Sequence, residues 1–470
     1  MRDLALVGFL FIIFVLGLRR PFMFVLGYVY IDIVSPQRLS YYLLNSIPIS
    51  LIFFLAAFLG WLVIDDKRGT RFSSRQLLLV LLLAWAGWTT WNADFPVQAL
   101  EKWSWVWKSL VFAIFLPLVL RTRLRIEALL LFMILSASSL VITGGIKTLV
   151  SGGGYGELNL GVADNSNLYE GSTISTVAVA IIPLILFLAR YGTIFPREWK
   201  VRLYATALIF ACLLIPVGTA ARTGLICIGA LAILMLRDTK RRFLYMAGVA
   251  MAVAVAVPFL PASYTQRMHT IQGYQADASA GTRLAVWKWT WDYVQDHPFG
   301  GGFNCYLQNH LTIHLADTKA AAGGSSTSSA VAYDQARAFH SSYFEMLGEQ
   351  GWPGFLMWIL LNLSGIFQMS LIRRRYRHAG EAEAWIAPLA GSLQIAHIIY
   401  MIGSLFVGIA FESFVYMLIG LQIGLSGYCQ RTRTPPGKSW GDAAGAPALA
   451  PRMPAVGWGA IPAPAGLDQP

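Results

Sequence analysis

Residues 203–236, LYATALIFACLLIPVGTAARTGLICIGALAILML, contain two apolar arms separated by the short polar stretch GTAARTG. A helix that crosses a bilayer needs about 20 mostly apolar residues, because the hydrocarbon core is about 30 Å thick. The stretch therefore predicts two helices that fold back on each other at GTAARTG in a membrane. Helices are favoured over a barrel, because barrel strands are short and alternate in polarity.

Apolar runs of this kind recur along the chain, which has 470 residues, 56% of them hydrophobic and 13% charged. Such a composition is typical of a protein that is solvated by lipid. The other runs cover residues 44–64, 76–92, 105–120, 126–142, 173–189, 243–260, 343–372, 384–402 and 405–428, with two shorter runs at 4–18 and 21–34. We therefore expect an all-α, polytopic membrane protein with about 12 transmembrane helices.

The positions of the basic residues that give the net charge of +12 indicate the topology of the chain in the membrane. Basic residues gather beside the apolar runs, at residues 67–75, 121–125, 190–202, 237–242, 373–377 and 431–438. Alternate connections lack such clusters, which is the pattern of the positive-inside rule. We expect the polar sequence of the other connections, above all residues 261–342, to lie outside the cytoplasm. The charge gives no reason to expect a nucleic-acid partner.

These patterns divide the chain into four parts. We expect N-terminal transmembrane helices in residues 1–260, a large periplasmic loop with amphipathic helices in 261–342, and C-terminal transmembrane helices in 343–430. Residues 431–470 are rich in Pro, Ala and Gly and show no periodicity that could bury a face, which predicts a disordered cytoplasmic tail.

Arg222 is notable for its predicted depth in the membrane. The arm from Gly224 to Leu236 has 13 residues by its numbering, which form roughly 20 Å of helix and are too few to span a bilayer. Arg222 should therefore lie within or just under the edge of the membrane, where a guanidinium is costly unless it meets water or an anion. Arginine is well shaped to grip a phosphate with two hydrogen bonds. The alternatives are contact with lipid headgroups or an ion pair with a loop carboxylate.

The run TRLAVWKWTWDYV in the loop predicts an amphipathic helix that lies in the membrane interface, with Thr282 as its N-cap. The expected apolar stripe is Leu284, Trp287, Trp291 and Val294. Arg283 would lie in the first turn, where a positive charge opposes the helix dipole, so a nearby anion would relieve a cost. The alternative is an ion pair with Asp277 or Asp292.

His340 directly precedes the long apolar run that starts near Tyr343, which places it at the mouth of a helix. A neutral imidazole there can accept a proton from a sugar hydroxyl. The alternative is a histidine that hydrogen-bonds loop backbone. The three glycines of DHPFGGGF, residues 300–302, fit either an anion-binding concavity or a flexible turn, and residues 320–332 fit a mobile lid or a disordered loop.

We expect no cofactor and no metal. His310 and His314 have the spacing of two ligands on one helix face, but no third ligand completes a zinc motif. Of the cysteines, Cys305 lies in the loop, and we expect no structural disulfide. Asp164, Asn165 and Asn167 lie in another outer loop, where they fit either a sugar-binding or diphosphate-binding site or the capped start of the next helix.

Four segments carry a resemblance to a known family. They are MRDLALVGFL with RRPFMFVLGYVYIDIVSPQRL near the start, GVADNSNL from Gly161, RMHTIQGYQADASAGTRLAVWKW, and FHSSYFEMLGEQGWPG. Together they resemble the O-antigen ligase superfamily, most closely the branch of O-glycosylation ligases associated with exosortase systems. Its members transfer a glycan from undecaprenyl diphosphate, at the periplasmic face of the bacterial inner membrane, to a hydroxyl on lipid A-core, a polysaccharide or a protein.

The resemblance implies roles for particular residues. Arg222, Arg283 and His340 occupy the positions of the family's two arginines and its histidine, while Ala221 replaces the usual serine before the first arginine. In this interpretation the arginines stabilise the leaving diphosphate without a metal, and His340 takes the proton of the acceptor hydroxyl in an inverting transfer. Lipid A-core is the preferred acceptor. The alternatives are a protein O-glycosylation ligase, a polysaccharide polymerase and, in another class, a transporter of lipid-linked saccharides.

Overall fold

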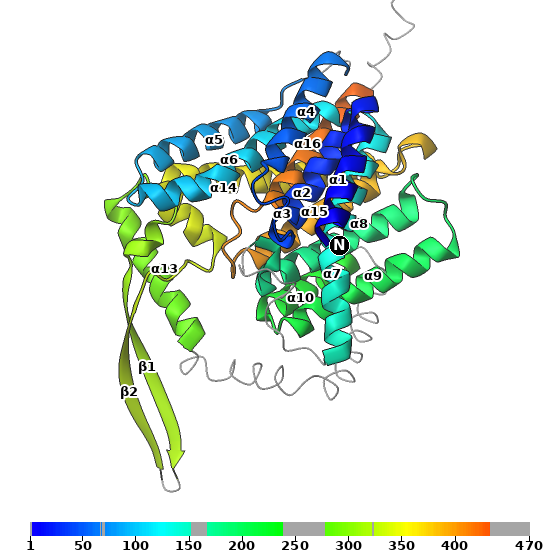
Figure 1. Ribbon diagram of the computed structural model, residues 1–470. Helices are drawn as coiled ribbons and strands as arrows, with labels where there is room; N and C mark the ends of the chain where they lie inside the picture. Colours follow the sequence, from blue (N-terminus) through cyan, green and yellow to red (C-terminus); the bar gives the residue numbers. More distant parts are fainter. Residues whose placement is uncertain are drawn as a thin grey trace, which may run out of the picture. The chain divides into compact units, whose positions relative to one another are not determined.

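The computed structural model describes residues 2–65, 67, 71–151, 167–237, 278–321 and 324–432, and it is mostly helical (Figure 1). Residues Met1–Gln430 form one compact unit. The first helices are α1 (Arg2–Arg19), α2 (Phe22–Val34), α3 (Pro36–Leu39), α4 (Ile49–Val63), α5 (Ser74–Trp91), α6 (Pro96–Val119) and α7 (Arg123–Ser151). After η1 (Asn167–Tyr169) come α8 (Gly171–Tyr191), α9 (Trp199–Gly218), α10 (Arg222–Leu236) and α13 (Ala278–Asp296). The last elements are η3 (Cys305–Gln308), β1 (His310–Ala321), β2 (Gly324–Gln335), α14 (Ser342–Arg375), η4 (Glu381–Glu383), α15 (Ile386–Gly403) and α16 (Ser413–Thr432).

The described part of the chain is mostly helical rather than all-α, and the length and apolar character of its helices are consistent with the predicted polytopic membrane protein. Within the described ranges, six helical segments are long and apolar enough to cross a membrane: Pro96–Val119, Arg123–Val150, Gly171–Tyr191, Trp199–Gly218, Ser342–Arg375 and Glu381–Gly403. Three shorter apolar helices accompany them. The run predicted at residues 243–260 lies outside the described residues, and a total of about 12 spans stays a prediction.

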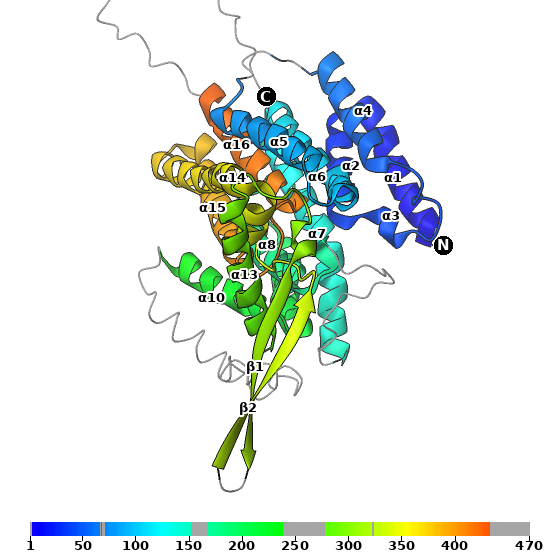
Figure 2. The same cartoon turned by 90° about the vertical axis from the view of Figure 1, so that its left-hand side faces the viewer.

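α16 forms the centre of the bundle (Figures 1 and 2). Almost every side chain from Ser413 to Ser426 is buried, so this helix is covered on all sides. A helix that is apolar all round is expected in the interior of a large membrane protein. α2 and α8 are also largely buried, whereas α1 and α9 keep many exposed apolar side chains that suit a lipid environment.

α14 is two helical segments joined at a sharp break, where the sequence predicted one apolar run. Gly351 has φ 62° and ψ −170°, which is not a helical conformation. A Cβ atom at this position would lie 2.3 Å from the carbonyl carbon of Phe299, so a larger residue does not fit. The break separates a short segment, residues 342–350, from a longer one that continues to Arg375.

The glycines of DHPFGGGF form the partner surface of this break. The amide of Gly301 donates to the carbonyl of Gly348 at 3.0 Å, the amide of Gly302 donates to the carbonyl of Glu349 at 3.0 Å, and that of Gly300 donates to His297 at 2.9 Å. All three N–H groups are therefore engaged within the protein. The predicted anion-binding concavity is wrong, because these N–H groups bond within the protein. The alternative of a turn after the helix is the one that the structure shows, and it packs closely against the break in α14.

Residues 310–321 and 324–335 form a pair of antiparallel strands, where helices and a mobile or disordered segment were expected. β1 and β2 pair antiparallel, from His310 opposite Gln335 to Ala321 opposite Gly324. The sequence HLTIHL alternates polar and apolar residues with a period of two, which is the signature of a strand. In a strand, His310 and His314 are about 13 Å apart, so helical spacing does not bring them to one metal ion.

Candidate active site

The ends of several helices meet next to His340. The amide of Ser342, at the start of α14, donates to the carbonyl of Ser404 just after α15, at 2.8 Å. The hydroxyl of Ser342 donates to the carbonyl of Val407 at 2.9 Å and accepts from the amide of Ile409 at 2.9 Å. These bonds hold the first turn of α14 against the connection between α15 and α16.

The start of α8 joins the same region. A Cβ atom at Gly403, the last residue of α15, would lie 2.3 Å from the side chain of Thr176, so the two helices are in close contact there. Glu170 caps α8, because its carboxylate accepts from the amide of Thr173 at 2.6 Å and from the hydroxyl of the same residue at 2.8 Å. The carboxylate of Glu170 is thereby fixed at the end of the bundle that carries His340.

Arg222 is the first residue of α10 and is half-buried. The preceding turn is tight, with Ala220 at φ 50°. It is tied to α8 by a hydrogen bond of 2.9 Å between the hydroxyls of Ser175 and Thr219. Gly224 fits directly against Pro216 and Ser175. As the sequence predicted, the two arms fold back at this turn, and the N-terminal end of a helix dipole adds to the positive potential beside Arg222.

His340 is held in an unusual backbone conformation. Its φ is 47°, in the left-handed region that is rare for residues other than glycine. The preceding carbonyl, that of Phe339, accepts a hydrogen bond of 2.9 Å from the indole N–H of Trp287, and the Trp287 ring stacks on Phe344 at 5.0 Å. Strained residues of this kind persist where the surroundings fix them, and they cluster at functional sites.

Arg283 acts on His340 electrostatically. Crowding by protein atoms lowers the pKa of His340 below its usual value of 6.5, and the positive charges of Arg283 and Arg337 lower it further, while Glu170 opposes them. Part of the residue nevertheless remains accessible to solvent. The imidazole is therefore neutral at neutral pH and can accept a proton from a group that approaches from outside.

α13, which carries Arg283, differs in detail from its sequence prediction. It begins at Ala278, so Thr282 is not its N-cap and Arg283 is not in its first turn. The argument from the helix dipole is therefore wrong. The buried face contains Val286, Thr290 and Val294 and packs beside α14 (Figures 1 and 2), while Leu284 and Trp291 of the predicted stripe are more than half exposed.

A buried ion cluster, which the sequence analysis missed, supports the helix behind His340. The ammonium of Lys102 on α6 lies 2.6 Å from Glu345 and 2.8 Å from Glu349, both in the first segment of α14. The Lys102 side chain is 13% exposed and that of Glu349 0%. The sequence did contain a signal for this cluster, namely two glutamates four residues apart inside an apolar run. Such residues are costly in a membrane unless they are paired.

Further contacts make this cluster a junction. The Glu349 carboxylate accepts from the amide of Asn304 at 3.0 Å, and the Glu345 carboxylate accepts from the amide of Ala410 at 3.1 Å. The Lys102 ammonium also lies 5.3 Å from the centre of the Phe303 ring. The cluster thus joins α6, the glycine turn, the first segment of α14 and the connection before α16.

The structure describes only some of the other predicted site residues. Asp164 and Asn165 lie outside the described residues. Asn167 opens η1 with φ 54°, and the cap of α8 is Glu170, so the helix start is not capped by Asn167. Cys305 is fully buried, which rules it out as an accessible loop thiol. In the part of the chain that the structure describes, no group of three or more His, Cys, Asp or Glu residues is arranged to hold a metal ion.

Two family models match different parts of the chain. Residues 206–359 match the model of a family described as O-Antigen ligase. Residues 1–193 match the model of a family of unknown function (DUF5935). A search of curated proteins finds no match. The first match includes Arg222, Arg283 and His340, and it confirms the predicted resemblance for an O-antigen ligase domain at residues 206–359.

Proposed function

We propose that this membrane protein, whose residues 206–359 carry an O-antigen ligase domain, is a glycosyltransferase of the periplasmic face of the bacterial inner membrane. It transfers a glycan from undecaprenyl diphosphate to a hydroxyl group, preferably on a lipid A-core sugar. The proposal is supported above all by His340, which is partly accessible to solvent and whose pKa is lowered by burial and by the charge of Arg283. Within the superfamily, the branch associated with exosortase systems is the one that the sequence most resembles.

The chemistry requires a base and a means to stabilise an anion. His340 accepts the proton of the acceptor hydroxyl, whose oxygen forms a bond to the anomeric carbon as the bond from that carbon to the diphosphate oxygen breaks. Negative charge grows on the departing undecaprenyl diphosphate. Arg222 and Arg283 stabilise it by charge-assisted hydrogen bonds, the role that a divalent metal has in other enzymes. Attack opposite the leaving group inverts the anomeric centre.

Binding of the sugar is the proposed role of Asp164, Asn165 and Asn167. Their segment directly precedes Glu170, whose charge acts on His340, which supports a position close to the transferred sugar. The acceptor is defined by chemistry alone, as a hydroxyl, so protein and polysaccharide acceptors use the same residues. Membrane lipids surround the apolar helices, and the mechanism needs no nucleotide.

Purified protein, incubated with an undecaprenyl-diphosphate glycan and candidate acceptors, tests the proposal. Lipid A-core, an acceptor peptide and a second lipid-linked glycan distinguish the three acceptor classes, and mass spectrometry identifies the product. We expect transfer without nucleotide and in the presence of EDTA, and transfer at least about 100-fold slower with His340→Ala. Movement of the glycan lipid across vesicles without product would favour transport instead, and loss of transfer in EDTA that zinc restores would overturn the metal-free mechanism.

The orientation in the membrane is part of the proposal and has its own test. The four native cysteines are all buried, so they give a low background with a membrane-impermeant thiol reagent. We expect labelling from the periplasmic side for Tyr333→Cys, whose parent side chain is 82% exposed on β2. Lys200→Cys, in the first turn of α9, should be labelled only after the membrane is opened. The reverse pattern would contradict the orientation.

A further inference from the structure

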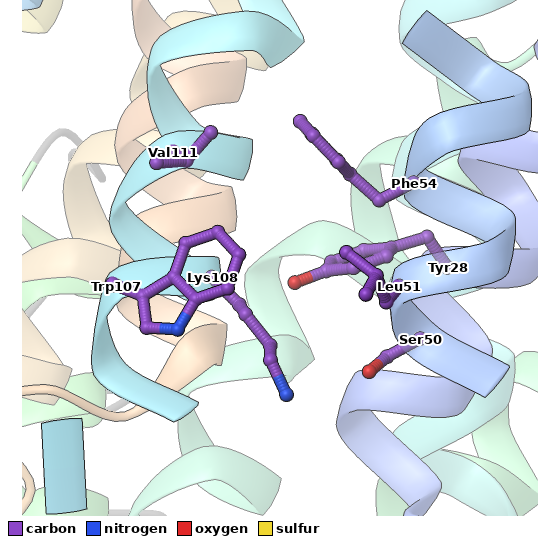
Figure 3. A pocket seen from close by; sticks show the side chains of 7 residues that line it. All are labelled: Tyr28, Ser50, Leu51, Phe54, Trp107, Lys108 and Val111. Carbon is purple, nitrogen blue, oxygen red and sulfur yellow. The ribbon is translucent and has the colours of Figure 1, made fainter. Parts of the chain in front are cut away.

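A narrow cleft lies between α2, α4 and α6, within the half of the chain that matches the family of unknown function. It encloses about 190 Å³ of empty space including its open mouth. The lining residues are Tyr28, Ser50, Leu51, Phe54, Trp107, Lys108 and Val111. Figure 3 shows Trp107 and Lys108 on one wall, with Tyr28, Ser50 and Leu51 opposite. The cleft is separate from His340.

Lys108 supplies a positive charge where it is costly. It lies at the start of the apolar run of α6, after the polar residues Glu101 and Lys102. In the part of the chain that the structure describes, no carboxylate makes a direct ion pair with it, and the buried Asp32 acts on it through space. An ammonium inside an apolar run would be stabilised further by an anion that makes direct contact with it.

Tyr28 adds an unused hydrogen-bond donor to the same cleft. The residue is 1% exposed, and its ring stacks on Phe112 at 4.0 Å. Its hydroxyl has no hydrogen-bond partner among the described residues. In Figure 3 this hydroxyl faces the cleft from the wall opposite Lys108. A buried hydroxyl without a partner is uncommon, and it indicates a site that a bound group completes.

Lys108 lies near the middle of α6 (Pro96–Val119), six residues and about 9 Å along the helix from Lys102. Lys102 pairs with Glu345 near the start of α14, on the side that carries His340. Trp103, Trp105 and Trp107 surround this level of α6. Tryptophan is enriched where the hydrocarbon of a bilayer meets the headgroups.

We propose that this cleft is a binding site for the phosphate group of a phospholipid from the leaflet on the His340 side. Lys108 pairs with the phosphate, Tyr28 and Ser50 donate hydroxyl hydrogen bonds to it, and the acyl chains follow the apolar wall of Leu51, Phe54 and Val111. None of the residues that line the cleft is Arg222, Arg283 or His340. The site thus differs from that of the glycan donor.

Lipid retention measured by native mass spectrometry tests the site without any assay of transfer. Protein in detergent is mixed with phosphatidylglycerol or with a galactosyl diacylglycerol, which has two acyl chains and no phosphate. We expect the wild type to retain one phosphatidylglycerol more than Lys108→Met, with apparent affinity about tenfold lower in the variant because a charge-assisted contact is lost. Lys108→Arg should keep the lipid. Lys200→Met, which removes a cation at the start of another span, is the matched control and should retain lipid as the wild type does.

Tyr28→Phe provides a second measurement that does not depend on the charge. The change removes a hydroxyl that has no partner, so the variant without lipid should unfold at a temperature equal to or above that of the wild type. Added phosphatidylglycerol should then stabilise it less than it stabilises the wild type. Equal retention by the wild type, Lys108→Met and Tyr28→Phe would overturn the proposal. So would displacement of the lipid by undecaprenyl phosphate at equal concentration, which would assign the cleft to the polyprenyl carrier.

Discussion

Removal of Lys102 should destabilise the protein strongly, because it leaves two carboxylates without a cation in the interior. Lys102 is 2.6 Å from Glu345 and 2.8 Å from Glu349, and these two side chains are 8% and 0% exposed. Loss of one partner of a buried ion pair costs about 3–5 kcal/mol, whereas loss of an exposed pair costs less than about 1 kcal/mol. We therefore expect Lys102→Met to lower the free energy of unfolding by about 3–5 kcal/mol.

Lys288→Met is the matched control, since it breaks an exposed ion pair. The side chain of Lys288 is 79% exposed and that of its partner Asp292 is 59% exposed. Unfolding is followed by tryptophan fluorescence in mixed micelles as the fraction of denaturing detergent increases. A triple variant that also carries Glu345→Gln and Glu349→Gln should regain most of the stability, because it contains no unpaired buried charge. If Lys102→Met were as stable as Lys288→Met, the cluster would not be the structural junction that we describe.

Three further predictions concern the proposed chemistry. His340→Ala should fold and bind the glycan donor but transfer about 100-fold more slowly or worse, the usual loss for a general base, and unchanged transfer would remove it from the mechanism. Arg222→Lys should lower transfer by about tenfold, because an ammonium loses the planar two-point grip, and wild-type kinetics would exclude that grip. Transfer should fall as the pH drops through the lowered pKa of His340. Arg337→Gln should move this limb of the rate profile to higher pH, and Glu170→Gln should move it to lower pH. The rate profiles are measured from about pH 4 to about pH 8. Equal profiles for both variants would contradict the electrostatic arrangement.

Apolar length and charge alone predicted most of the helices. The run at residues 173–189 lies within α8 (Gly171–Tyr191), and the run at 203–221 overlaps α9 (Trp199–Gly218). A bilayer imposes these lengths, so the signal lies within each segment and needs no knowledge of the partners. The turn before Arg222 was predictable for the same reason, because the apolar arm that follows it is too short to span a bilayer.

Features that depend on distant contacts were not predictable in this way. The break at Gly351 requires the backbone of Phe299 beside it, and the roles of the glycines at 300–302 become visible only with that partner. The helical face of α13 was misjudged because Trp287 and Trp291 suggested an interface with lipid, whereas Val286 and Thr290, outside the predicted stripe, bury their side chains against protein. The pair of strands was missed although HLTIHL alternates, because helical spacing was given to its histidines.

The first segment of α14 explains how an exposed histidine can have a fixed geometry. At its start, Ser342 is bound to Ser404; in its middle, Lys102 holds Glu345 and Glu349; at its end, Gly351 fits against the glycine turn. A segment fixed at three points can maintain the left-handed backbone of His340, whose cost must be offset by its surroundings. A general base gains from such fixation, because displacement by about 1 Å can cost about 100-fold in rate. The interior ion cluster therefore helps to fix the position of the His340 imidazole, although no motif in the sequence connects them.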